Sequence, residues 1–111
     1  MNRGEIWTLQ DRQYASKARP VVVVQNDAYQ TFDSVVLCLF TTFESESIPT
    51  RVFIKATKQN GLYKDSYVMT DKIVTVDKGI LGERLGVLSK KDMDAVSKQL
   101  RVILGLVNNN D

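Results

Sequence analysis

Polar side chains that could carry out chemistry stand at three predicted strand ends. They are Arg19, the neighbours Thr41 and Thr42, and the neighbours Asp71 and Lys72. A rigid sheet holds side chains at strand ends in place and leaves them free of packing, so binding and catalytic sites are common there. If these ends converge, they suit phosphoryl transfer, because a guanidinium can stabilise the charge that develops on phosphate oxygens.

The residue types would contribute differently to such a site. Threonine supplies a hydroxyl donor. Asp71 could accept a proton, but a carboxylate with an ordinary pKa of about 3.9 is a weak base at neutral pH unless burial raises that pKa. Each residue also has a structural interpretation: Arg19 as a surface charge, Thr41 and Thr42 as strand formers, and Asp71 as a turn residue.

The composition excludes several classes of site. The 111 residues contain no histidine and one cysteine, which excludes a catalytic histidine and leaves too few nitrogen and sulfur ligands for zinc. A carboxylate site for magnesium stays open. Cys38 lies inside an apolar run and is expected to be buried rather than reactive. The formal net charge of +2 permits an anionic partner without demonstrating one.

Length and hydrophobicity predict one small globular domain over residues 1–111. A hydrophobic share of 43% with 25% charged residues is typical of a chain that buries a core. The longest apolar runs are Val21–Val24 and Val35–Phe40, far shorter than the ~20 residues that cross a bilayer, and the polar start lacks a signal-peptide hydrophobic region. We therefore expect a cytoplasmic protein.

Short β-rich segments separated by polar turns, followed by one helix, predict an α+β fold that is mainly β. The expected strands are 5–10, 21–24, 35–40, 51–55, 67–70, 73–76 and 85–88. The β-branched run 21–24 suits a strand covered on both faces, with Pro20 at its first position. Turn residues between this run and 35–40 make the two antiparallel neighbours, and Asn60-Gly61 marks another tight turn.

The C-terminal part predicts one amphipathic helix that begins at Ser89. Ser89 with Asp92 resembles a capping box, with Asp in place of the usual Glu or Gln. Apolar residues then recur at helical spacing, and we expect the stripe to pack on the core; it comprises Met93, Val96, Leu100, Ile103, Leu104 and Val107. Asn108–Asn110 are expected to end the helix.

Several segments together resemble the MazF/PemK/Kid toxin family, over nearly the whole chain. They are Arg3-Gly4-Glu5-Ile6-Trp7, the stretch from Arg19 to Asp27, Thr41-Thr42, Asp65-Ser66, and the stretch from Asp71 to Lys78. The resemblance implies a homodimer of a small SH3-like or CcdB-like β-barrel with a C-terminal α-helix. It also implies the toxin of a type II toxin–antitoxin pair, an endoribonuclease that cuts single-stranded mRNA at short sequences. Such enzymes use no metal or other cofactor, since the ribose 2′-OH attacks the adjacent phosphate.

Carried over residue by residue, the resemblance implies catalytic roles at the strand ends. Arg19 matches the arginine of the family's R-P-V motif, which contacts the scissile phosphate and assists proton transfer. Thr41 matches the threonine that holds the same phosphate, with Thr42 as the alternative because the alignment shifts by one position there. Asp71 matches an acidic position that some members use as a base.

Polar residues around these positions are the expected RNA-binding residues. Arg12 and Lys17 share the loop before Arg19, and Thr42 and Lys72 complete the set. We also expect an acidic segment of the antitoxin to fold onto this basic loop and cover Arg19.

The chain departs from the family pattern at several places. The segment 11–18 is shorter than the family's glycine-containing loop, Lys72 and Val74 replace the common glutamine and arginine of the D-Q-I-R-T motif, and Met69 stands where the Kid branch has arginine. Two alternatives therefore stay open. One is a decayed homologue that only binds antitoxin. The other is a CcdB-like gyrase-binding toxin, although the segment 104–111 lacks the aromatic residue which that class uses near its C-terminus.

Overall fold

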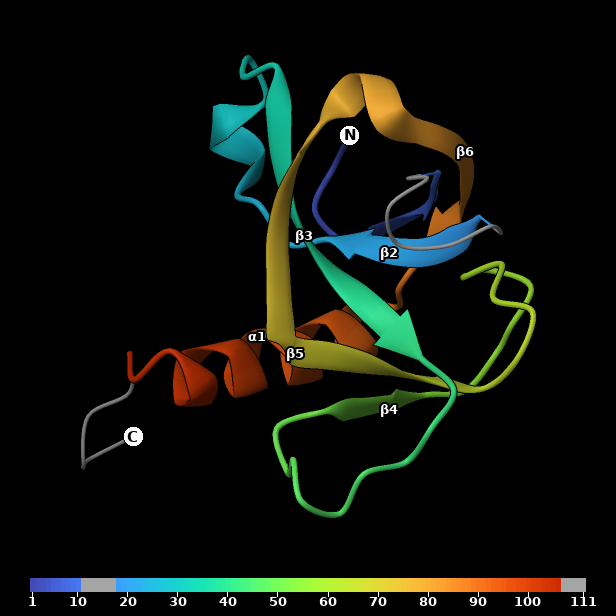
Figure 1. The fold of residues 1–111 in the computed structure, drawn as a ribbon, viewed down its shortest axis with the longest axis vertical. Helices are drawn as coiled ribbons and strands as arrows, with labels where there is room; N and C mark the ends of the chain where they lie inside the picture. Colours follow the sequence, from blue (N-terminus) through green and yellow to red (C-terminus); the bar gives the residue numbers. More distant parts are fainter. Residues whose placement is uncertain (11–17, 107–111) are drawn as a thin grey trace.

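The computed structural model describes residues 1–10 and 18–106. Within these ranges a six-stranded sheet comprises β1 (Glu5–Leu9), β2 (Arg19–Val23), β3 (Ser34–Thr41), β4 (Val52–Ile54), β5 (Ser66–Asp77) and β6 (Leu81–Val87). The helix α1 (Lys90–Ile103) follows the last strand, and two short 3-10 helices, η1 (Asp27–Tyr29) and η2 (Lys78–Ile80), lie in connections. Figure 1 shows the curved sheet with α1 crossing beneath β5.

Antiparallel pairing joins every pair of neighbours in the strand order β4-β5-β3-β2-β1-β6. This confirms the mainly β fold with a C-terminal helix and the antiparallel neighbours β2 and β3. In the described part of the chain β4 and β6 do not pair with each other, so the sheet is a curved half-barrel with two edges rather than a closed barrel.

The central strand β2 packs on both of its faces. Val22 belongs to one cluster of buried side chains, which includes Val96 and Leu100 of α1. Val21 and Val23 belong to a second cluster on the opposite face of the sheet. All three valines are fully buried, as the β-branched run predicts. Burial of each such side chain contributes about 1.5–3 kcal/mol to the stability of the fold. The backbone of β2, and of the residues at its ends, is therefore held firmly in place.

Cys38 is fully buried in β3, as its place in an apolar run predicts. Burial, and after it the charge of Asp71, raises the pKa of the thiol to about 12. Since the thiolate is the reactive form, Cys38 is a packing residue.

The strand β5 differs from expectation. The prediction of two short strands separated by the Asp71-Lys72 pair is wrong, because β5 runs through it as one strand of 12 residues. The pairing with β3 shifts between Cys38, opposite Ile73, and Leu39, opposite Met69. This β-bulge takes up the extra residues without ending the strand and bends β5 sharply (Figure 1).

The remaining predicted strands are confirmed. Their ends agree within one or two residues, except that β6 begins at Leu81 rather than residue 85. The predicted turn at Asn60-Gly61 is also present. Gly61 has φ of +69°, a conformation that a residue without Cβ adopts readily.

The helix α1 agrees with its predicted start and differs at its end. The Oγ atom of Ser89 accepts a hydrogen bond from the Asp92 N–H at 3.1 Å. Leu100 is buried, but Ile103 is 43% exposed and Leu104 is 54% exposed. The expectation that the whole stripe packs on the core is therefore wrong for the last turn, which projects beyond β5 (Figure 1).

Some predicted features lie outside the described residues. These are Arg12, Lys17, Val107 and Asn108–Asn110. Among residues 1–10 and 18–106, no helix has the length and apolar character needed to cross a membrane.

Candidate active site

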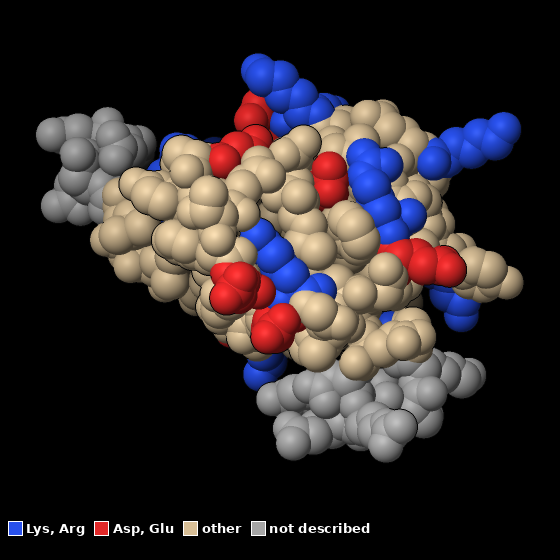
Figure 2. Space-filling view, turned by 90° about the horizontal axis from the view of Figure 1, so that it is seen from above, with Lys and Arg blue, Asp and Glu red and all other residues tan. Residues whose placement is uncertain are grey.

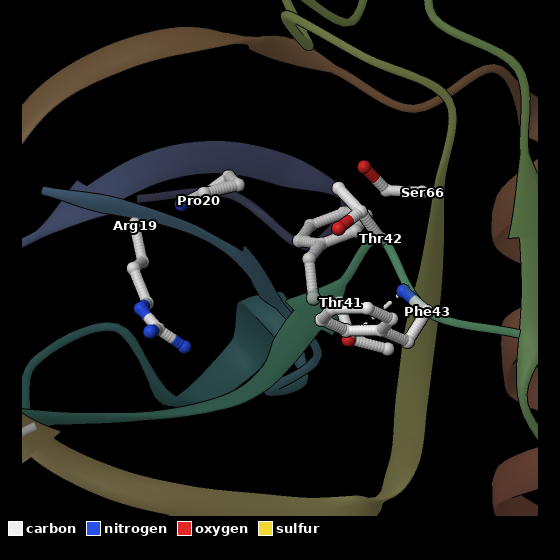
Figure 3. A pocket seen from close by; sticks show the side chains of 7 residues that line it. Arg19, Pro20, Thr41, Thr42, Phe43 and Ser66 are labelled. Atoms are coloured by element: carbon white, nitrogen blue, oxygen red, sulfur yellow. Dashed lines mark hydrogen bonds between the residues drawn. The ribbon is translucent and has the colours of Figure 1, made fainter. Parts of the chain in front are cut away.

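The start of β2 and the end of β3 meet at one edge of the sheet. Because the two strands are antiparallel, with Val21 opposite Leu39, the residue that opens β2 lies near the residue that closes β3. An open cavity of about 290 Å³ lies there, lined by Arg19, Pro20, Phe40, Thr41, Thr42, Phe43 and Ser66. The structure thus brings together three of the predicted site residues, the arginine and both threonines (Figure 3).

Arg19 presents an exposed guanidinium to this cavity. Its backbone is fixed by the sheet, since it lies opposite Leu9 of β1. Within the described ranges no hydrogen bond or ion pair engages its side chain. Figure 3 shows it on one side of the cavity, with Thr41, Thr42 and Phe43 on the other. A cation positioned at a cavity wall is suited to bind an anionic group.

Thr41 is partly buried and is held by a hydrogen bond. Its Oγ1 accepts from the backbone N–H of Phe43 at 3.2 Å (Figure 3). A hydroxyl has one donor and two acceptor positions, so this contact leaves the hydroxyl hydrogen free to donate to a ligand. Thr42 is more exposed than Thr41 and lines the same cavity.

Asp71 does not line the cavity and pairs with Arg51. The Nε of Arg51 lies 3.0 Å from Oδ1 of Asp71, and Nη2 lies 3.1 Å from Oδ2, which makes the pair bidentate. The two side chains are 13% and 21% exposed. The hydrogen bond from Arg51 lowers the pKa of Asp71, against the opposing effect of burial. Asp71 is therefore a weaker base than an ordinary carboxylate, and its predicted catalytic role stays a prediction.

Other residues of the site carried a weaker signal in the sequence. Arg51 opens the predicted strand 51–55, and Phe43 follows the two threonines outside any predicted strand, so neither pattern indicates a site. Ser66 lines the cavity from β5, and its hydroxyl donates to the carbonyl of Lys64 at 2.9 Å. Lys72 is exposed beside Asp71, and its charge adds to the lowering of that carboxyl's pKa.

The electrostatic character of the surface is mixed. Figure 2 shows basic and acidic side chains interspersed on one face of the molecule, separated by uncharged surface. Among residues 1–10 and 18–106, no group of three or more Cys, Asp or Glu side chains is arranged to hold a metal ion. An anionic ligand on the displayed face would therefore meet local cations rather than a broad positive field.

Comparisons with known proteins agree with this geometry. Residues 2–104 match the family described as PemK-like, MazF-like toxin of type II toxin–antitoxin system. A probable endoribonuclease MazF from Mycolicibacterium smegmatis is 36% identical over 107 residues, which cover 96% of this chain and 98% of that protein. Endoribonuclease EndoA from Bacillus subtilis is 33% identical over 92 residues, covering 81% of this chain and 78% of that protein.

A solved structure supports the same relationship. It is an endoribonuclease in complex with its cognate antitoxin from a mycobacterial species, 28% identical with a TM-score of 0.82, and the match covers 97% of this chain and 98% of that one. Family match, sequence relatives and fold agree over nearly the whole length. The chain belongs to the PemK-like, MazF-like toxins of type II toxin–antitoxin systems.

Proposed function

We propose that this chain, as a single toxin domain, is a sequence-selective endoribonuclease that cuts single-stranded RNA and is neutralised by a cognate antitoxin. The observation that carries the proposal is that Arg19 and Thr41, from two different strands, line one open cavity. The relatives in Mycolicibacterium smegmatis and Bacillus subtilis are named endoribonucleases, and the similar mycobacterial structure contains a cognate antitoxin.

The cavity supports a cleavage in which the RNA supplies its own nucleophile. The ribose 2′-oxygen gives its proton to a water molecule and bonds to the adjacent phosphorus, the bond from phosphorus to the 5′-oxygen breaks, and that oxygen takes a proton from water. The products are a 2′,3′-cyclic phosphate and a 5′-hydroxyl. Arg19 would stabilise the charge on the nonbridging oxygens, and the free hydroxyl hydrogen of Thr41 would add a second donor.

Metal-free chemistry is part of the proposal because the sequence has too few nitrogen and sulfur ligands for zinc, and because no group of three or more carboxylates among the described residues is arranged to hold magnesium. The guanidinium of Arg19 would then stabilise the negative charge on the phosphate oxygens, which a metal ion does in other nucleases. The carboxylate of Asp71 is a poor general base in this arrangement, because its pairing with Arg51 lowers its pKa. We therefore propose that Arg19 assists the proton transfers, as the family resemblance implies.

The partners of the toxin follow from its surface and edges. We propose a homodimer, because the sheet leaves β4 and β6 as edges and because exposed apolar side chains gather at the end of α1: Val102, Ile103, Leu104 and Leu106. We propose that the antitoxin covers the Arg19 cavity with an acidic segment. The site of action is the cytoplasm, where mRNA is found.

The alternatives make different predictions. A gyrase-binding toxin is not favoured, since the curated relatives are endoribonucleases by name. A decayed homologue would bind antitoxin and leave RNA intact.

The test is cleavage of a mixed-sequence single-stranded RNA by purified, antitoxin-free protein, once with EDTA and once with added magnesium. We expect equal cleavage at a restricted set of sequences, and inhibition on titration with antitoxin. Cleavage only with magnesium would overturn the metal-free mechanism. Antitoxin binding without any cleavage would select the decayed homologue, and inhibition of gyrase without RNA cleavage would select the second alternative.

A further inference from the structure

Phe43 is an exposed aromatic residue at the mouth of the candidate active site. Its side chain is 79% exposed, and it lines the cavity together with Arg19 and Thr41. The hydrogen bond from its backbone N–H to Oγ1 of Thr41 ties its position to that of the proposed phosphate-binding hydroxyl. Figure 3 shows the ring beside Thr41. A large apolar ring held at the edge of this cavity suits a ligand with a flat apolar face.

An aromatic pair, Tyr67 and Phe53, lies next to Thr41 across the sheet. Tyr67 of β5 lies opposite Thr41 of β3 on one side and opposite Phe53 of β4 on the other. Residues directly opposite one another on neighbouring strands point to the same face, so these three side chains form a row. The rings of Phe53 and Tyr67 have centroids 5.4 Å apart at an interplanar angle of 62°, and Phe53 is 51% exposed.

The charge beside this row distinguishes between the parts of a nucleic acid. Glu44 follows Phe43 directly in the chain, so its carboxylate stands next to the exposed ring of Phe43 in sequence. Burial, and after it the charge of Glu44, raises the pKa of the Tyr67 phenol. A phosphate group would be repelled by that carboxylate, whereas an uncharged nucleobase would not. The aromatic rings of Phe43, Tyr67 and Phe53 therefore suit nucleobases, while the exposed guanidinium of Arg19 suits phosphate.

We infer that Phe43 and the Tyr67–Phe53 pair form a stacking platform for the bases next to the cleaved phosphate, with Phe43 as a substrate-positioning residue. The inference rests on the proposed function. Single-stranded RNA is commonly held by stacking of its unpaired bases on aromatic side chains. Here the platform would hold a base while Arg19 and Thr41 hold its phosphate.

The test uses an RNA that the wild-type protein cuts, made resistant by a single 2′-deoxynucleotide at the mapped cut site. Dissociation constants are measured by fluorescence anisotropy for Phe43→Ala, Phe43→Leu and Phe43→Trp. We expect Phe43→Ala to weaken binding by about 5- to 30-fold, as loss of one stacked base would. Phe43→Leu should stay weak and Phe43→Trp should restore binding. The matched control is Phe32→Ala, since Phe32 is 52% exposed but does not line the cavity.

A second arm identifies the base that is stacked. Each nucleotide beside the cut is replaced in turn by an abasic one. One replacement should weaken wild-type binding by a similar factor and should have little further effect on Phe43→Ala. If Phe43→Ala weakened the binding of intact RNA and of every abasic RNA by the same factor, the inference would be overturned. Phe43 would then affect binding through Thr41 rather than by contact with a base.

Other outcomes separate this inference from the proposed function. Wild-type protein that cuts RNA together with a Phe43→Ala protein of unchanged affinity would overturn the platform and leave the nuclease intact. Wild-type protein that neither binds nor cuts RNA would overturn both. A shift from dimer to monomer in Phe43→Ala or Phe53→Ala, measured by light scattering, would assign this face to a second copy of the chain and overturn the inference.

Discussion

Two arginines at the margins of the sheet have the same side chain and different surroundings. Arg51 precedes β4, is 13% exposed and makes a bidentate pair with Asp71. Arg19 opens β2, is exposed, and within the described ranges has no ion pair. The carboxylate of Asp71 already neutralises Arg51, so that arginine has little to offer a phosphate. Within the described ranges no carboxylate pairs with Arg19, and we propose Arg19 as the functional member of the two.

The different surroundings of the two arginines predict that Arg51 matters for the stability of the fold and Arg19 for activity. A partly buried bidentate pair stabilises the fold modestly, and removing one partner leaves the other uncompensated. An exposed cation at a cavity contributes little to folding and much to binding or catalysis. Substitutions at the two arginines should therefore affect opposite properties.

The largest effect is expected for Arg19→Ala. Its cleavage rate should fall by roughly 10² to 10³, as expected on loss of a preorganised transition-state donor. Its free energy of unfolding should change by less than about 0.5 kcal/mol, as for other exposed substitutions. The measurements are single-turnover cleavage and urea unfolding, with Arg51→Ala as the matched control. Greater loss of activity in the control than in Arg19→Ala would reverse the assignment.

A smaller effect is expected for the threonines. Thr41→Ala should slow cleavage by about 10- to 100-fold, because it removes one hydroxyl donor and the contact that positions Phe43. Thr41→Ser keeps the hydroxyl and should retain most activity. Thr42→Ala should have the lesser effect in the same assay, and the opposite ranking would assign the catalytic hydroxyl to Thr42.

The Arg51–Asp71 pair should appear in the pH dependence of stability. Because the folded pKa of Asp71 is lowered, the pair stabilises the protein above the unfolded pKa of about 3.9 and loses this contribution as pH falls through the folded pKa. Asp71→Asn should therefore lower the free energy of unfolding by about 1 kcal/mol at pH 7.

The measurement is urea unfolding of Asp71→Asn and wild type at pH 7 and at about pH 3. The difference between the two proteins should shrink at the lower pH. A difference that is constant with pH would mean that the pair contributes nothing through its charge. Loss of cleavage by more than about 10²-fold in Asp71→Asn at unchanged fold would assign Asp71 a catalytic role instead.

The smallest effect is expected for the exposed Lys72. Lys72→Ala should weaken RNA binding a few-fold and reduce the salt dependence of binding by about one phosphate contact. Lys98→Ala, on the outer side of α1, is the matched control. Equal salt dependence in both variants would remove Lys72 from the RNA-binding set.

Much of this arrangement is predictable from local patterns. The β-branched run 21–24 and the apolar run 35–40 identify two buried strands. The turn residues between the two runs predict that the strands are antiparallel. That geometry alone brings Arg19 and Thr41 to the same edge. The position of the helix cap at Ser89 follows in the same way from hydrogen-bonding side chains close in sequence.

Other features depend on contacts between distant segments. The Asp71-Lys72 pair looks like a strand break, and only the pairing of β5 with β3 shows that a bulge takes it up. The partner of Asp71 is Arg51, 20 residues away. The exposed turn at Ile103 could not be distinguished from core, since periodicity gives the apolar face of a helix but not the extent of the sheet beneath it.

The central claim is that Arg19 and Thr41 promote attack by the RNA's own 2′-OH. It is tested most directly by the chemistry of the product ends. An RNA of defined sequence is cut in the presence of EDTA, and the fragments are analysed by mass spectrometry beside a copy with a single 2′-deoxynucleotide at the cut site. We predict a 2′,3′-cyclic phosphate, a 5′-hydroxyl and complete resistance of the deoxy-substituted copy. Fragments with a 3′-hydroxyl and a 5′-phosphate, or cleavage of the deoxy-substituted copy, would contradict it.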